Sequence, residues 1–151
     1  GNAQDFYIGL DDSEDDLVIG KGSALGTTPA LSIDENLLVT VSDDIKVTDR
    51  AYGHVHDNSN SFTFDLSESN DFKTTSNTGS TITFTNVKEG QSGNIMLVNG
   101  GNHAIVGHAD VAINASVLST ISATGTYHLA YFVTAASGNN TILVSASGIL
   151  T

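Results

Sequence analysis

Apolar and polar residues alternate along several short segments, the pattern of β-strands with one buried side. In the second half of the chain the alternation is clear in pairs such as Phe62/Phe64, Ile82/Phe84 and Ile142/Val144. Segments rich in Gly, Ser and Asn separate the strands and are typical of turns. The pattern predicts six strands within residues 61–67, 80–87, 93–99, 103–113, 125–134 and 140–150. Residues 115–125 are predicted to form one helical turn or a loop.

The first half shows shorter segments of the same kind. Residues 5–11 and 16–22 flank the acidic sequence DSED and predict a hairpin, and further short strands are expected at 30–35, 36–42 and 44–49. Segments this short bury little surface by themselves, so this half is expected to need partners.

These patterns predict an all-β chain with a short-strand stalk over residues 1–59 and a β-sandwich or jelly-roll head over residues 60–151. The expected core of the head consists of the apolar residues that alternate within its strands: Phe62, Phe64, Leu66, Ile82, Phe84, Ile95, Leu97, Ile105, Leu129, Tyr131, Val133, Ile142 and Val144.

Composition narrows the functional classes. The chain has no cysteine, which excludes a disulfide framework, thiol catalysis and zinc fingers. Five Lys and Arg against 17 Asp and Glu give a formal net charge of -12. We therefore expect neither nucleic acid nor an anionic membrane as a partner, because phosphate binding needs clustered basic residues. No apolar run approaches the roughly 20 residues of a membrane span, and the N-terminus lacks a signal-peptide pattern, as expected of a fragment of a longer chain.

The first half carries an acidic hairpin followed by Ile-Gly-x-Gly, Gly-Thr-x-Pro-x-Leu and Ile-Asp. This succession resembles a segment of phage tail-fibre and tailspike proteins, and its residues here are Ile19, Gly20, Gly22, Gly26, Thr27, Pro29, Leu31, Ile33 and Asp34. Residues 61–66, 87–101, 118–134 and 140–151 resemble C-terminal β-sandwich modules of marine phage structural proteins. The resemblance implies a homotrimeric fibre, tail or capsid appendage whose head contacts the host surface.

Three segments invite a chemical interpretation, and a simpler one is favoured for each. The glycines of residues 20–26 lack the helix that a nucleotide-binding loop requires, so they are interpreted as turn glycines. The acidic run 11–16 is interpreted as a solvated hairpin tip, with weak calcium binding as the alternative. Ser92 does not have the Gly-x-Ser-x-Gly spacing of a nucleophile elbow.

The isolated histidines, His103, His108 and His128, are expected to be ordinary strand residues. The absence of Trp and the scarcity of other aromatic residues disfavour a polysaccharide depolymerase, although Asp and Glu are plentiful. We therefore expect no enzyme activity.

His54 and His56 form the sharper candidate. In a strand, residues two apart point to the same side with Cα atoms about 6.6 Å apart. Three copies around an axis would bring six imidazoles together, an octahedral set that favours iron or nickel over zinc. The resemblance also implies such a clamp. The alternative is that both imidazoles face solvent or line an interface without metal.

The expected function is attachment of a virion to a host cell-surface glycan or protein by a homotrimer joined to the rest of the tail or capsid. The alternatives are a purely structural capsid decoration or head fibre and, third, a depolymerase. Loops rich in Ser, Thr, Asn and Gly suit hydrogen bonding to sugars. The candidate receptor-binding residues in these loops are Asn77, Thr78, Asn102, Asn139 and Asn140.

Overall fold

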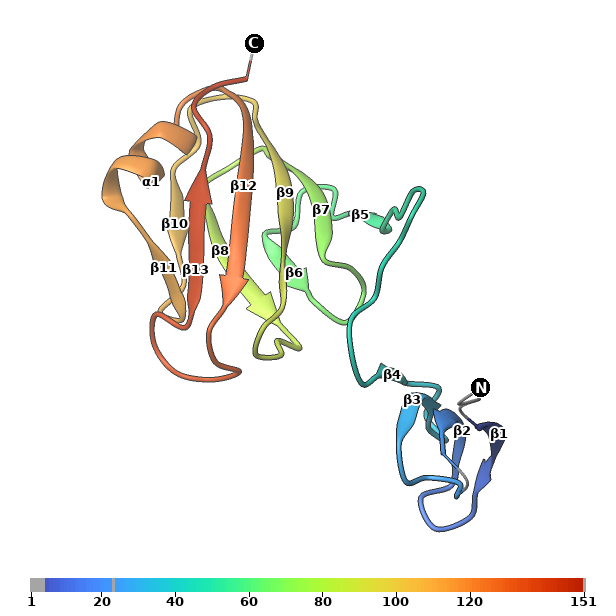
Figure 1. Cartoon of the computed structure of the whole chain (residues 1–151). Coiled ribbons are helices and arrows are strands. Elements are labelled where there is room, and N and C mark those ends of the chain that lie inside the picture. Colours follow the sequence, from blue (N-terminus) through green and yellow to red (C-terminus); the bar gives the residue numbers. More distant parts are fainter. Residues whose placement is uncertain (1–4, 23, 151) are drawn as a thin grey trace. The chain divides into compact units, whose positions relative to one another are not determined.

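The computed structural model describes residues 5–22 and 24–150, which form thirteen strands and one short helix (Figure 1). The all-β prediction is confirmed. The chain divides into two compact units, one ending at Ala51 and the other beginning at Tyr52. Ser23, in the predicted glycine turn, and Thr151, at the end of the resembling segment, lie outside the described residues. No helix in the described part of the chain is long and apolar enough to cross a membrane.

The first unit is a single antiparallel sheet of four strands in chain order. The predicted hairpin is confirmed, with Asp11 paired to Asp16 at its tip. Residues 44–49 are not in a strand, contrary to the sequence prediction. The strands of this sheet are β1 (Phe6–Asp11), β2 (Asp16–Lys21), β3 (Pro29–Ile33) and β4 (Val39–Val41).

One side of this small sheet is covered by the loop between β2 and β3. A Cβ on Gly9 would lie 3.0 Å from the Leu25 side chain, and the Thr28 backbone N–H donates to the Tyr7 hydroxyl at 3.3 Å. Val18, on the same side, is 3% exposed and is the one buried apolar residue in the described part of the first unit. The first unit alone therefore has almost no hydrophobic core.

The second unit is a two-layered β-sandwich. Its larger sheet has six strands in the order β11 (Val111–Ile113), β13 (Ile142–Ala146), β12 (Gly125–Val133), β9 (Ser92–Asn99), β7 (Asp71–Ser76) and β5 (Val55–Asp57). Its smaller sheet has three strands in the order β10 (Ile105–Gly107), β8 (Ser80–Thr85) and β6 (Thr63–Asp65).

The chain winds between these two sheets. Strands β5, β7 and β9 lie side by side and parallel in the larger sheet, while β6, β8 and β10 do the same in the smaller one. This part is a short solenoid, and antiparallel β12 and β13 extend the larger sheet beyond it. A jelly roll is built from antiparallel strands, so the parallel winding is a different way of making the predicted sandwich.

The interior between the sheets is apolar and aromatic. All thirteen core residues predicted from the sequence are buried. The rings of Phe72, Phe64, Phe84 and Tyr131 follow one another with centroids 5.0 to 5.5 Å apart, in tilted and edge-on pairs that suit aromatic quadrupoles. Five buried apolar residues were absent from the prediction: Val18, Phe72, Val111, Ile121 and Tyr127.

Helix α1 (Ala115–Ile121) confirms the helical turn expected within residues 115–125. The Asn114 side chain accepts a hydrogen bond from the Ser116 backbone N–H, which satisfies one of the unpaired donors at the helix start. Ile121 anchors the helix in the core with no exposed surface.

Three details differ from the sequence prediction. Residues 55–57, placed in the stalk, pair with β7 and belong to the sandwich. Residues 103–113 form two strands in different sheets, because a turn closes from the Val111 N–H to the His108 carbonyl. Strand β7 was not predicted at all, since Thr74 and Ser76 occupy its inward positions. Their hydroxyls donate to backbone carbonyls, so these buried polar groups are satisfied.

Candidate functional site

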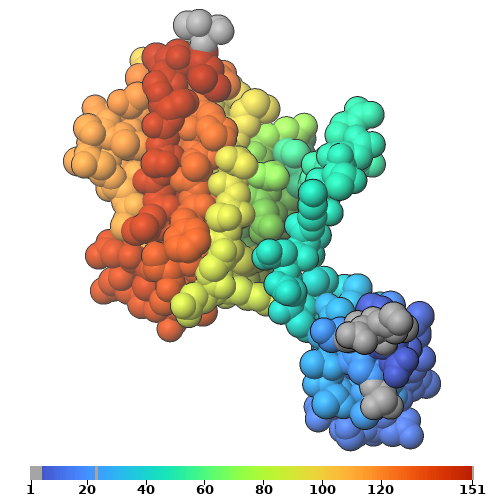
Figure 2. Space-filling model, viewed as in Figure 1, coloured from blue at the N-terminus to red at the C-terminus, as the bar shows by residue number. Residues whose placement is uncertain are grey.

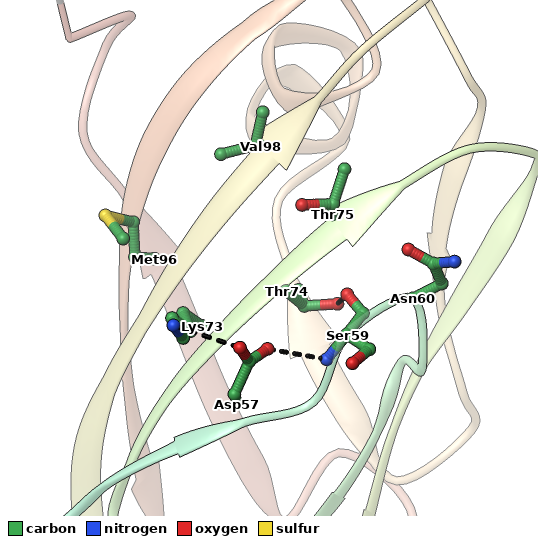
Figure 3. A pocket seen from close by; sticks show the side chains of 8 residues that line it. All are labelled: Asp57, Ser59, Asn60, Lys73, Thr74, Thr75, Met96 and Val98. Carbon is green, nitrogen blue, oxygen red and sulfur yellow. Dashed lines mark hydrogen bonds and ion pairs between the residues drawn. The ribbon is translucent and has the colours of Figure 1, made fainter.

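A polar hollow of about 440 Å³ lies on the outer face of the six-stranded sheet (Figure 3). Alternation along β7 and β9 turns Lys73, Thr75, Met96 and Val98 outward, opposite to their buried neighbours. The remaining wall is formed by Asp57, at the end of β5, and by Ser59 and Asn60 in the loop after it. Figure 2 shows the sheet surface beside it as a continuous face of β13, β12 and β9.

An ion pair crosses one side of the hollow. The Lys73 ammonium lies 3.0 Å from the Asp57 carboxylate, which also accepts the Ser59 backbone N–H at 2.9 Å. These contacts, with the Lys73 hydrogen bond as the largest cause, hold the pKa of Asp57 below its ordinary value of 3.8. The Asp57 carboxylate is therefore charged at neutral pH, and both side chains remain accessible to a ligand because they are about half exposed.

The loop beside the ion pair is held in place by β7. The Thr75 backbone N–H donates to the Ser59 carbonyl at 2.8 Å, and the Thr74 hydroxyl donates to the Ser61 carbonyl at 2.8 Å. Ser59 itself has a positive φ of 52°, which these bonds stabilise. The backbone of this wall is therefore held in place before any ligand arrives.

A second polar network extends the site toward β12. The Asn94 amide donates to the Asp71 carboxylate at 2.9 Å, and its oxygen lies 2.9 Å from the His128 Nε2. Beyond it, Phe132 and Leu143 each leave 47% of their surface exposed. The outer face therefore combines charged and hydrogen-bonding groups with apolar surface, which suits binding of a sugar or a polar peptide.

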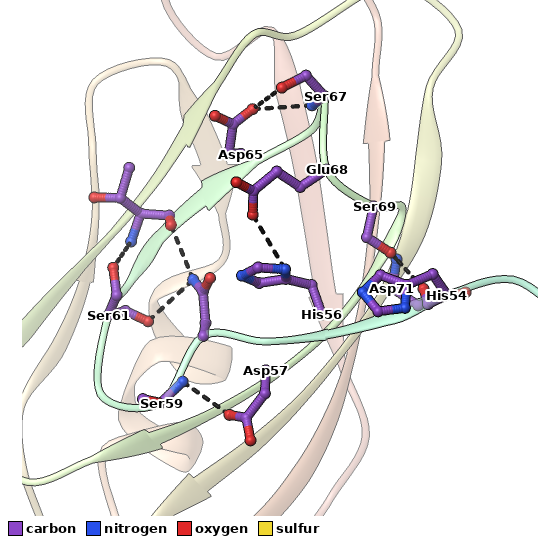
Figure 4. Close-up of polar contacts among 12 residues, drawn as sticks. His54, His56, Asp57, Ser59, Ser61, Asp65, Ser67, Glu68, Ser69 and Asp71 are labelled. Carbon is purple, nitrogen blue, oxygen red and sulfur yellow. Dashed lines mark hydrogen bonds and ion pairs between the residues drawn. The ribbon is translucent and has the colours of Figure 1, made fainter.

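The two histidines of the predicted metal pair lie at the edge of the same sheet (Figure 4). His56 is engaged within its own chain, because its Nδ1 lies 3.1 Å from the Glu68 carboxylate and its ring packs edge-on against Phe72 at 5.9 Å. His54 is exposed, its ring centroid lies 6.2 Å from that of His56, and its carbonyl accepts the Ser69 hydroxyl.

A single chain does not complete a metal site with this pair. Among residues 5–22 and 24–150, no group of three His, Asp or Glu side chains is arranged to hold an ion. The geometry gives His56 a packing role, in which it covers the end of the aromatic row that begins at Phe72. The clamp of iron or nickel at a threefold axis stays a prediction that requires further copies.

The predicted receptor-binding residues do not share one surface. Asn77 and Thr78 follow β7 and Asn102 follows β9, two parallel strands, so these three lie at one end of the sandwich. Asn139 and Asn140 follow β12, which runs antiparallel to β9, and therefore lie at the opposite end. The Asn102 side chain accepts the Thr124 backbone N–H at 2.7 Å and so ties two loops together. Their receptor role stays a prediction.

The other segments have structural explanations. Asp11 accepts bonds from the Ser13 hydroxyl and backbone N–H, which lower its pKa and close the acidic tip. Ser92 begins β9, away from any strand-to-helix turn. His108 pairs with Asp110 at 2.7 Å in the turn after β10, and His103 lies outside the strands, whereas His128 is in β12.

Sequence reasoning missed Asp57, Lys73 and Met96 as neighbours. The available signal was the alternation in residues 71–76, where every second position is Asp, Lys or Thr.

Compared with known proteins, the chain matches no family model, no curated protein and no solved structure.

Proposed function

We propose that this protein is a non-catalytic attachment module of a phage-type virion appendage, and that its sandwich binds a host-surface glycan in the hollow between β5, β7 and β9. The observation that carries the proposal is the preformed wall of the hollow. There the Asp57–Lys73 ion pair stands beside hydroxyls, an amide and the apolar side chains of Met96 and Val98.

These groups match the chemistry of a sugar. Sugar hydroxyls both donate and accept hydrogen bonds. In an ion pair the carboxylate can accept from such hydroxyls while the ammonium donates to them. The apolar side of the ring would lie against Met96, which is 47% exposed. Binding without cleavage is favoured because the hollow contains one carboxylate, whereas glycoside hydrolysis requires a pair.

The proposed assembly is a homotrimer on the tail or capsid of a virion. The first unit supports self-assembly, because a four-stranded sheet with one buried apolar residue is poorly stabilised by its own contacts. A purely structural capsid decoration is the second candidate, and the single-layer architecture of the first unit is compatible with it. A depolymerase is the third.

Attachment is tested by adding the fluorescently labelled protein to a panel of marine bacterial strains and to their purified envelope polysaccharides. We expect binding to some strains and no release of reducing ends. Lys73→Met should weaken binding at least tenfold, since a hydrogen bond to a charged group is worth about 1.5–3 kcal/mol. Thr75→Val should weaken binding about fivefold, since a neutral hydrogen bond is worth about 1 kcal/mol.

Lys88→Met and Thr81→Val are matched controls. They make the same changes of charge and hydroxyl at exposed positions outside the hollow. Equal loss in the control variants would refute the hollow as the site, and absence of binding to every strain together with firm binding to virions would favour the structural decoration.

A further inference from the structure

The side of the first unit's sheet that its own loop leaves uncovered is almost entirely apolar. The strand registers align its side chains in two rows across all four strands. One row is Ile8, Ile19, Leu31 and Val41, and the other is Leu10, Leu17, Ile33 and Val39. Phe6 extends these rows at one corner. These nine residues are called the apolar face below.

The apolar face is open in a single chain. Phe6, Ile8 and Leu10 leave 75%, 73% and 70% of their surfaces exposed, and Val39 leaves 52%. Together with the partly exposed Leu17 and Ile19, these residues expose on the order of 700 Å², backbone atoms included, against the roughly 800 Å² that each partner contributes to a stable interface. Apolar patches of several hundred Å² on a monomer commonly mark interaction sites.

Charge is excluded from the apolar face. The acidic residues of the hairpin tip are in the turn or, like Asp11 and Asp16, in strand positions of the opposite side. The one basic residue in register with the face is Lys21, which pairs with Phe6 at its corner. Protein interfaces are typically depleted of charged residues at the centre and carry them at the rim.

The missing core of the first unit indicates which partner covers the apolar face. Small domains without a sufficient core are usually held by disulfides, by a metal or by oligomerisation. The chain has no cysteine, and the described residues hold no cluster of metal ligands. Oligomerisation remains, and every copy of the chain brings the same apolar surface.

We propose that the apolar face is a self-association interface that binds the same face of other copies of this chain. Copies whose apolar faces turn toward a common axis would interdigitate these rows and form the core that each unit lacks. The apolar face would be the assembly surface of the proposed appendage. That the assembly contains three copies rests on the proposed function.

The test is the mass of the full chain in solution, measured by light scattering and sedimentation at micromolar to tens of micromolar concentration. The unaltered protein should have the mass of several chains. Ile8→Lys should have the mass of one chain under the same conditions, because an ammonium within the interface cannot be buried unpaired. Lysine lowers the net negative charge of the chain, so loss of assembly cannot come from greater overall repulsion between the acidic copies.

Val106→Lys is the matched control, since Val106 is a 49% exposed strand residue of the second unit, and it should keep the mass of the unaltered protein. Val39→Thr, which keeps shape and strand preference, should raise the assembly midpoint concentration severalfold. Circular dichroism checks that each variant is folded.

A single-chain mass for the unaltered protein, or a mass unchanged by Ile8→Lys, would overturn the inference. A two-chain mass that Ile8→Lys abolishes would support the interface and refute the threefold form. Failure to bind host cells by a protein that assembles through this face would refute the attachment function alone.

Discussion

Ionisation of Tyr131 should destabilise the sandwich at alkaline pH. Its ring packs against Phe84 in the core, 3% of the residue is exposed, and its hydroxyl donates to the Asn70 carbonyl at 2.9 Å. Burial, with a smaller contribution from the Asp71 charge, raises the pKa of this phenol from 10.0 to about 12. The folded state therefore holds a proton that the unfolded chain releases.

The sign and size of the effect follow from linkage. Below pH 10 both states are protonated and Tyr131 adds no pH dependence. Between pH 10 and about 12 the unfolded state ionises first, so the free energy of unfolding falls as the pH rises. With these two pKa values the loss is about 1.4 kcal/mol at pH 11, or one factor of ten in the unfolding equilibrium.

The measurement is urea unfolding followed by circular dichroism from about pH 8 to 11, for the unaltered protein, Tyr131→Phe and Tyr52→Phe. At pH 8 Tyr131→Phe should lose about 1 kcal/mol with the hydrogen bond. Between pH 8 and 11 its free energy of unfolding should fall by about 1.4 kcal/mol less than that of the unaltered protein. Tyr52 is 95% exposed, so Tyr52→Phe should follow the unaltered protein. Equal alkaline slopes for the unaltered protein and Tyr131→Phe would refute the reasoning.

Two further predictions concern the core and the histidine pair. Phe64→Ala should lower the free energy of unfolding by about 3–5 kcal/mol, because Phe64 is 1% exposed and its ring contacts three aromatic neighbours. Phe132→Ala, at a 47% exposed position, should cost less than half as much in the same urea titration. Elemental analysis decides the role of His54: a clamp gives about one iron or nickel ion per three chains, lost in His54→Ala, whereas a packing role of His56 alone gives none.

Alternation was sufficient to predict many strands of the sandwich and most of its core, but not β7. Residues such as Phe64, Ile82 and Leu129 are buried because each lies on the inward side of an alternating strand, a property local to the sequence. Phe72 was missed because its strand carries polar inward neighbours, Thr74 and Ser76. The Thr74 hydroxyl is satisfied by the Ser61 carbonyl of the preceding loop, and the Ser76 hydroxyl by the Thr78 carbonyl of the following turn.

Neither the parallel winding nor the hollow could be predicted in this way. Asp57 and Lys73 meet because β5 and β7 lie parallel in register, and that pairing passes over the intervening strand β6. Alternation fixes which side of a strand is buried but carries no information about which strand lies next to it. In the first unit, alternation likewise predicted only the separate segments. The alignment of their side chains into the two rows of the apolar face depends on the strand registers.

The position of β13 sets an order in which the sandwich can be completed during synthesis. It lies between β11 and β12, so β11 has no neighbour in the sheet until the later strand arrives. The solenoid strands can assemble as they leave the ribosome, since each pairs with one made shortly before it. A nascent chain whose residues 142–146 are still inside the ribosome would leave β11 without a sheet partner, so β13 completes the six-stranded sheet.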